Sequence, residues 1–162
     1  ASALPLGFPS NQEVVDIWLE NETPLPEVEA ALARALPPGI QVTNIQKIEG
    51  HAAALQTEME ASEFAVTLLE YLPDLEAGLE RLLHSDSLPR QRREKTYDLR
   101  PLILDLQLLP NDPQGHQRLF TRLAAREGAT GRPEEVLAAL GANPEMARFH
   151  RLRLIFRESD HP

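Results

Sequence analysis

The chain has 162 residues, of which 42% are apolar and 25% are charged, so it can form a hydrophobic core. It has no cysteine, which excludes disulfides, cysteine nucleophiles and thiolate-bound metal or iron–sulfur sites within it. It also lacks a signal peptide and any run of about 18 apolar residues. We therefore expect a cytoplasmic protein without membrane contact, and the absence of an initial Met suggests part of a longer polypeptide.

The net charge of −9 is unevenly distributed. Residues 1–89 carry 15 acidic and 3 basic side chains, whereas residues 90–162 carry 10 acidic and 13 basic ones. Such polarity indicates an anionic partner for the second half. Acidic helices in the first half would produce the same imbalance without any partner.

The first 50 residues read as strand, helix, strand. Apolar residues alternate over 14–19, and a second extended segment is expected at 40–48. Between them a helix is expected to begin near Pro24 and to end at Pro37. Its apolar residues follow the spacing of a core-facing helix: Val28, Ala31, Leu32, Ala35 and Leu36.

The remainder predicts a mixture of strands and helices. Helix-forming residues favour helices at 52–60 and 73–84, and a short one after Pro133 that ends at Gly141. A turn is expected at 128–131. The arginine spacing of 118–126 also suits a helix, but alternation favours a strand. Strands are expected at 63–69, 87–93, 96–109, 118–126 and 149–156.

This order predicts the α+β class, with two small ferredoxin-like units packed together, the first of them incomplete. The expected division is 1–50 for the first unit, 51–62 for a connector and 63–162 for the second unit. One continuous domain over 1–162 is the alternative.

A glycine turn that leads into a helix is the first candidate site. In residues 128–135, the helix start would present backbone N–H groups to a phosphate or carboxylate. Thr130, Gly131 and Arg132 would contact this anion. The alternative is a plain capped turn, because Glu134 and Glu135 already complement the helix dipole.

A basic cluster around Tyr97 is the second candidate. Its side chains would contact nucleic-acid phosphates while the tyrosine stacks on a base. A solvated hairpin is the alternative. The cluster comprises Arg90, Arg92, Arg93, Lys95 and Arg100.

Strand alternation provides the third candidate. If 118–126 is extended, Arg118, Phe120, Arg122 and Arg126 share one face. The same rule places Arg151, Arg153 and Arg157 on one face of the last strand. Two such strands in one sheet would resemble an RNA-binding surface, although the chain has no RNP motif.

No catalytic constellation is evident. The histidines have no metal-ligand spacing, the serines lack a nucleophile-elbow context, and neighbouring glutamates suit solvated helix faces. We therefore do not expect this chain to be catalytic on its own.

Three stretches resemble a known family. They are residues 3–7 (Ala-Leu-Pro-Leu-Gly), residues 95–103 (Lys-Thr-Tyr-Asp-Leu-Arg-Pro-Leu-Ile) and residues 131–141 (Gly-Arg-Pro-Glu-Glu-Val-Leu-Ala-Ala-Leu-Gly). Together they are similar to the radical SAM-linked protein family, a domain of unknown function fused to, or encoded beside, a radical SAM protein. In that family a strand and a helix precede the first stretch, so the resemblance implies a truncated first unit. Its exposed sheet edge would pair with another chain, giving a possible homo-oligomer.

The resemblance implies a partner that carries an iron–sulfur cluster and S-adenosylmethionine, with no cofactor in this chain. The leading hypothesis is an accessory domain that positions an anionic substrate, with RNA the first to test. The alternative is a docking module for the radical SAM partner without substrate contact, in which Asp98 and Glu135 pair with nearby arginines. The expected contacts are Arg92, Arg93, Lys95, Arg100, Arg132 and Arg151.

Overall fold

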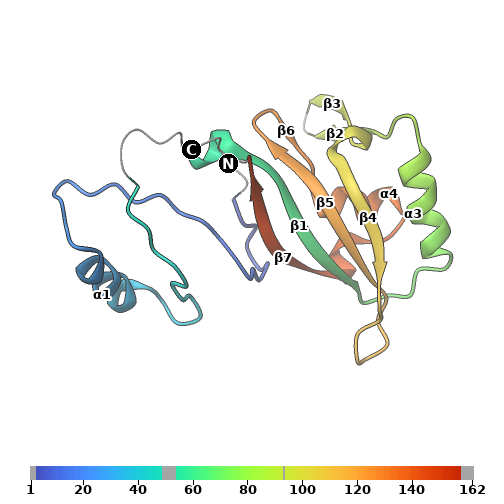
Figure 1. The fold of residues 1–162 in the computed structure, drawn as a ribbon. Helices are drawn as coiled ribbons and strands as arrows, with labels where there is room; N and C mark the ends of the chain where they lie inside the picture. The colour runs from blue at the N-terminus through green and yellow to red at the C-terminus, as the bar shows by residue number, and fades with distance from the viewer. Residues whose placement is uncertain (1–2, 49–53, 93, 158–162) are drawn as a thin grey trace. The chain divides into compact units, whose positions relative to one another are not determined.

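A computed structural model describes residues 3–48, 54–92 and 94–157 (Figure 1). The chain divides into two compact units. The sheet unit comprises Ala1–Val14 and Leu55–Pro162, and the α1 unit comprises Val15–Ala54. Residues 3–14 thus fold with the sheet unit, whereas the expected first unit ran over 1–50.

The sheet unit is built on four antiparallel strands in the order β4-β5-β1-β7. Helix α3 lies between β1 and β4 in the chain, and α4 lies between β5 and β7. This is the split β-α-β arrangement of ferredoxin-like folds, and the chain is α+β as its element order predicts. The bounds are β1 Met59–Leu68, α3 Leu75–His84, β4 Ile103–Leu109, β5 Arg118–Arg126, α4 Pro133–Ala139 and β7 Ala147–Phe156.

Both helices cover the same face of the sheet. Leu75, Leu79 and Leu82 of α3, and Val136 and Leu137 of α4, are buried in one cluster with strand residues. The spacing of the α3 leucines explains why this helix packs through one side. The strand residues of the cluster are Phe64, Val66, Leu68, Ile103, Leu106, Leu119, Leu123 and Phe149. The face toward the viewer in Figure 1 carries no labelled helix, and we call it the open face.

Short elements complete the sheet unit. The strands β2 Pro89–Arg92 and β3 Lys95–Asp98 form a separate hairpin. The two-residue strand β6 Ala129–Thr130 pairs with the end of β5, where we expected a turn. The helical pieces are α2 Leu55–Glu58, η1 Arg100–Leu102 and η2 Pro144–Met146.

The N-terminal segment lies along the outer edge of β7. Ser10 forms a parallel bridge with Arg151, whose N–H donates to the Pro9 carbonyl. The Phe8 ring stacks on Phe149 with 4.8 Å between ring centroids. These contacts cover part of the β7 edge.

The α1 unit contains one described helix, α1 Leu25–Ala35, which begins and ends close to its predicted limits. Its described residues contain no strand, so the prediction of strands at 14–19 and 40–48 is wrong for this chain. Alternation shows that a segment suits a sheet, but a strand also needs a neighbour to accept its backbone hydrogen bonds.

Candidate functional site

The candidate site is the open face of the sheet. Strand pairing places its residues in three rows that run across the four strands. Each row takes one residue from each strand in the order β4, β5, β1, β7. We name them the cation row, the aromatic row and the ion-pair row. They are Leu109–Arg118–Thr67–Arg148, Gln107–Phe120–Ala65–His150 and Asp105–Arg122–Glu63–Arg153.

The alternation of each strand assigns these residues to the open face. On β5, Leu119 and Leu123 belong to the core cluster, so Arg118, Phe120 and Arg122 face the other way. The prediction that these three share a face is therefore confirmed. On β7, the buried ring of Phe149 likewise leaves the neighbouring residues 148 and 150 on the open face.

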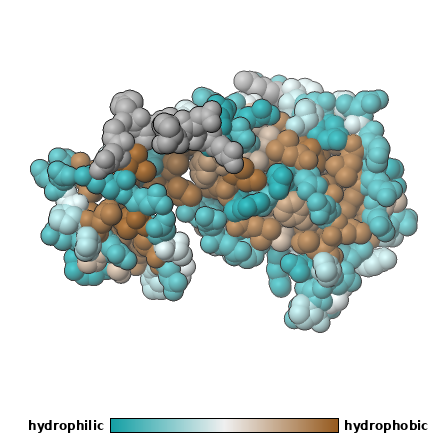
Figure 2. Space-filling model, in the orientation of Figure 1, coloured by the Kyte–Doolittle hydropathy of each residue, from teal (hydrophilic) through white to brown (hydrophobic). Residues whose placement is uncertain are grey.

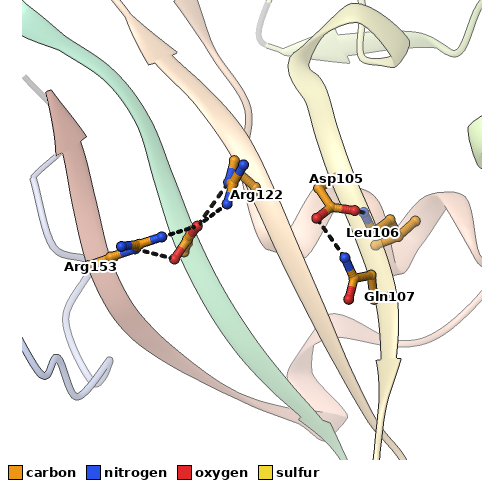
Figure 3. A network of polar contacts seen from close by, with 6 residues as sticks. Asp105, Leu106, Gln107, Arg122 and Arg153 are labelled. Carbon is orange, nitrogen blue, oxygen red and sulfur yellow. Dashed lines mark hydrogen bonds and ion pairs between the residues drawn. The ribbon is translucent and has the colours of Figure 1, made fainter. Parts of the chain in front are cut away.

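Arginines neutralise the carboxylate at the centre of the ion-pair row (Figure 3). Glu63, whose side chain is 6% exposed, contacts Arg153 at 2.6 Å and Arg122 at 2.7 Å. The hydrogen bond from Arg153, with help from Arg122, holds the pKa of Glu63 below its ordinary value against the opposing effect of burial. Asp105 accepts from the Leu106 N–H and from the Gln107 amide. This row is thus internally balanced in charge.

The cation row has no such balance. Arg118 is partly exposed and Arg148 is exposed, with Thr67 between them on β1. In the part of the chain that the structure describes, neither guanidinium forms an ion pair. Neighbouring strands lie about 4.8 Å apart, so the two positions are separated by about 10 Å across the sheet. The row itself contains no carboxylate, and Arg118 also lines a pocket with Asp74, Glu76 and Glu80.

The aromatic row lies between the other two. Phe120 and His150 flank the small side chain of Ala65, and both rings are partly exposed. The His150 Nε2 lies 2.6 Å from the Asn11 Oδ1, which fixes the ring beside the N-terminal segment. Figure 2, in the orientation of Figure 1, shows hydrophilic residues interspersed with apolar ones on this unit. The rows combine cations, a hydroxyl and an aromatic ring on one surface.

A β-bulge changes the predicted face of the last strand. Pairing shifts between Glu63 and Phe64, which oppose Arg153 and Arg151 respectively, so residue 152 is the additional one. The bulge places Arg153 on the open face and turns Arg151 toward the ring of Phe64, 5.5 Å away. The prediction that Arg151 and Arg153 share a face is therefore wrong.

Arg151 is enclosed by the protein. Its side chain is 1% exposed and lies 3.0 Å from the Glu13 carboxylate. Its guanidinium also donates to the Ala3 carbonyl at 3.2 Å. The structure thus joins it to the N-terminal segment and separates it from the exposed arginines.

The residues of the Asp-Leu-Arg-Pro stretch bond to the backbone. Asp98 accepts from the N–H groups of Leu88 and Arg100 at 2.7 and 2.9 Å, which lowers its pKa. Arg100 donates to the carbonyls of Leu83 and Ile103. The Arg100 bonds join the end of β3 to α3 and β4. The Asp98 carboxylate caps a backbone turn, whereas the docking alternative expected it to pair with an arginine side chain.

The hairpin and α4 are joined by an ion pair. Arg92 contacts Glu135 at 2.7 Å and lies over the Tyr97 ring, 5.0 Å from its centroid. Burial, together with the nearby Glu135, raises the pKa of Tyr97 to about 12, and this dominates the opposing effect of Arg92. The pairing of Glu135 with an arginine, expected for the docking alternative, is confirmed.

The glycine turn before α4 already uses its polar groups. The Gly131 N–H donates to the Ala124 carbonyl, and the Thr130 hydroxyl donates to the Arg126 carbonyl. A Cβ on Gly131 would lie 3.2 Å from the Leu123 Cβ, so close packing explains the glycine. Arg132 is exposed at the start of a helix of only seven residues.

The predicted contact residues thus do not form one surface. Arg92 and Arg100 contribute to packing at the hairpin, whereas Arg151 lies beneath the N-terminal segment. Arg93 lies outside the described residues, and the same holds for the side chain of Lys95.

Sequence reasoning missed the partners that complete the open face: Thr67, Arg148 and His150. Arg148 and His150 alternate with the apolar Phe149, a signal that could have placed them opposite the core. Their proximity to Arg118 and Phe120 depends on strand order, which alternation does not provide.

No helix in the described ranges is long and apolar enough to cross a membrane. Over the same residues, no three His, Cys, Asp or Glu side chains are grouped so that they could bind a metal ion.

Fold and site define a class: an α+β protein whose antiparallel sheet is covered by helices on one face and carries arginines on the other. Within that class, the chain belongs to the family described as an uncharacterized protein conserved in bacteria, DUF2344, whose model matches residues 1–133. The match includes Arg118 and Phe120 and ends before β7. No curated protein and no solved structure matches the chain.

Proposed function

We propose that this chain is a cytoplasmic accessory module of a radical SAM system and that it positions an anionic substrate, with RNA as the first candidate. One observation supports this most: the cation row presents Arg118 and Arg148 without a carboxylate between them. The radical SAM partner follows from the resemblance of the Arg-Pro stretches.

The three rows offer the two kinds of group that bind single-stranded nucleic acids, guanidinium groups and an aromatic ring. Proteins bind such strands by combining guanidinium groups that contact phosphates with aromatic rings on which bases stack. Phe120 lies two residues from Arg118 along β5, a separation of about 7 Å. A base over Phe120 would therefore place its flanking phosphates within reach of the cation row.

The reaction chemistry is assigned to the partner. A radical SAM enzyme uses an iron–sulfur cluster and S-adenosylmethionine, and this chain has no cysteine to bind such a cluster. The role proposed for these residues is to bind and orient the substrate.

The test is the salt dependence of affinity for an oligouridylate. For single strands, the slope of log affinity against log salt is about −0.7 for each phosphate contact. Replacing both Arg118 and Arg148 by Gln should weaken binding and reduce that slope by about 1.4. The matched control replaces Arg34 and Arg81, which are exposed on α1 and α3, and should leave the slope unchanged. Absence of binding at low salt, or equal losses in both double variants, would reject the proposal.

The alternative is a module that docks to the radical SAM partner without substrate contact. It is favoured by Arg92, Asp98 and Arg100, whose polar groups are bonded within the fold. Capture of the partner by the full chain, unchanged in the Arg118→Gln/Arg148→Gln variant and combined with no affinity for RNA, would support it.

A further inference from the structure

The α1 unit exposes an unusual amount of apolar surface. Helix α1 has no buried residue, although its apolar side chains follow the spacing of a core-facing helix. Figure 2 shows apolar residues gathered on this unit. Trp18 is 79% exposed and Val15 is 74% exposed. Other exposed apolar residues of the unit are Ile17, Leu19, Leu25, Ile40, Val42 and Ile48.

An apolar groove lies along α1. It has a volume of about 570 Å³ and lies between the helix and the extended segment that contains Ile17 and Leu19. Its helical wall includes Val28, Ala31 and Leu32, which belong to the predicted core stripe. The groove therefore occupies the place where a helix of this kind normally packs on a sheet.

Two segments of the α1 unit, one of which lines the groove, have the sequence of strands. Apolar residues alternate over 15–19, and β-branched residues are frequent over 40–48. Neither segment is assigned as a strand in the described chain. An extended peptide from a partner could pair with the 15–19 backbone as a neighbouring strand. The same peptide would cover the apolar side of α1 formed by Val28, Ala31 and Leu32.

The charge of the unit indicates the chemistry of the occupant. Residues 15–54 contain six acidic and two basic side chains, a net charge of −4. Glu27 and Arg34 both line the groove, so the negative charge that would attract a basic segment comes from the unit as a whole. A second copy would bring the same negative charge, whereas a basic segment would be attracted.

We propose that the groove of the α1 unit binds an extended segment of a partner polypeptide in which apolar and basic residues alternate. The segment pairs with the 15–19 backbone as an added strand and places its apolar side chains on Val28, Ala31 and Leu32. This inference is independent of RNA binding by the sheet unit.

The full chain is titrated with a synthetic peptide of about eight residues in which Val and Lys alternate. Trp18 is the only tryptophan, so its fluorescence reports on this unit alone. We expect its emission to shift to shorter wavelength, and amide hydrogen exchange over 15–19 to slow. A peptide of alternating Val and Glu, and a Val–Lys peptide with methylated backbone nitrogens, serve as controls.

Matched variants on α1 localise the effect. Val28→Ser should weaken peptide binding about tenfold, because the groove loses an apolar contact of about 1.4 kcal/mol. Ala33→Ser changes an exposed position that does not line the groove and should leave binding unchanged. Circular dichroism verifies that both variants keep α1.

Three results would overturn the proposal. They are no Trp18 response up to about 1 mM peptide, equal responses to the Val–Lys peptide and its controls, and burial of Trp18 by self-association of the chain without peptide. The last would assign the groove to a second copy.

Discussion

Two sets of arginines in the sheet unit differ in what surrounds them. The enclosed set, Arg92, Arg100 and Arg151, is bonded to carboxylates and backbone carbonyls of the same unit. The exposed pair, Arg118 and Arg148, shares a row of the open face with no carboxylate in it. Each arginine of either set adds one to the basic count of the sequence, but a guanidinium that is already paired within the fold contributes little to the field that a ligand meets.

We therefore expect the enclosed arginines to contribute to folding stability and the exposed pair to contribute to ligand binding. A guanidinium that satisfies buried groups cannot be removed without leaving them unpaired. A solvated guanidinium can be removed at almost no cost to folding, because surface substitutions change stability by about 0.5 kcal/mol or less. Variants of the two sets should therefore affect different measurements.

The largest effect is expected for Glu13→Ala, which removes the carboxylate beside Arg151. Since that guanidinium is 1% exposed, its charge remains buried without this counterion. The free energy of unfolding should fall by about 3 kcal/mol, measured by urea denaturation. Arg151→Met removes the charge while keeping the length, and it should cost less than Glu13→Ala. The reverse order would show that the ion pair is not what holds Arg151.

The next effect is expected for Arg100→Ala. The side chain donates to the Leu83 and Ile103 carbonyls, so its loss should cost about 2 kcal/mol of unfolding free energy. Arg100→Lys should recover little, since an ammonium lacks the planar fork that spans both carbonyls. Thermal unfolding of both variants measures this. Full recovery by lysine would mean that charge alone matters.

The exposed pair should behave in the opposite way. Arg118→Gln with Arg148→Gln should change unfolding free energy by at most about 0.5 kcal/mol while it weakens RNA binding. Urea denaturation beside the salt titration distinguishes the two effects. A loss of stability as large as that of Arg100→Ala would place the pair in the enclosed set.

The smallest effect is a dependence on pH. The pKa of Glu63 is held below the ordinary value of 4.5 by Arg153 and Arg122, so its ionised form favours the folded state. This contribution is complete above that ordinary value and is lost as pH falls through the depressed pKa. Glu63→Gln should therefore reduce the decline in stability on acidification. An unchanged acid profile would contradict the assigned role.

The sequence predicts the elements whose pattern is local. Residues 118–126 form a strand within the predicted bounds, and the core residues Leu119 and Leu123 are separated by an even number of positions from each other and alternate with the arginines 118 and 122. The stripe of Leu75, Leu79 and Leu82 similarly identifies α3. In both segments the periodicity of the residues matches that of the backbone, so neighbouring residues suffice to identify the element.

The sequence does not reveal what depends on distant partners. The extended segments 14–19 and 40–48 have strand character, yet the described chain supplies no neighbouring strand. The extra residue at 152 separates Arg151 from Arg153, and this bulge appears only in the pairing with β1. Arg148 was missed because its neighbour Arg118 is 30 positions away and lies beyond the central strand β1.

The most direct test of the central claim is an NMR titration of the ¹⁵N-labelled chain with oligouridylate at low salt. The arginine Nε–H signals report on individual guanidinium groups. If the cation row binds RNA, the signals of Arg118 and Arg148 shift with the backbone amide of Phe120, while those of Arg92 and Arg100 remain in place. Shifts confined to the enclosed set, or no shift in any of them, would contradict such binding.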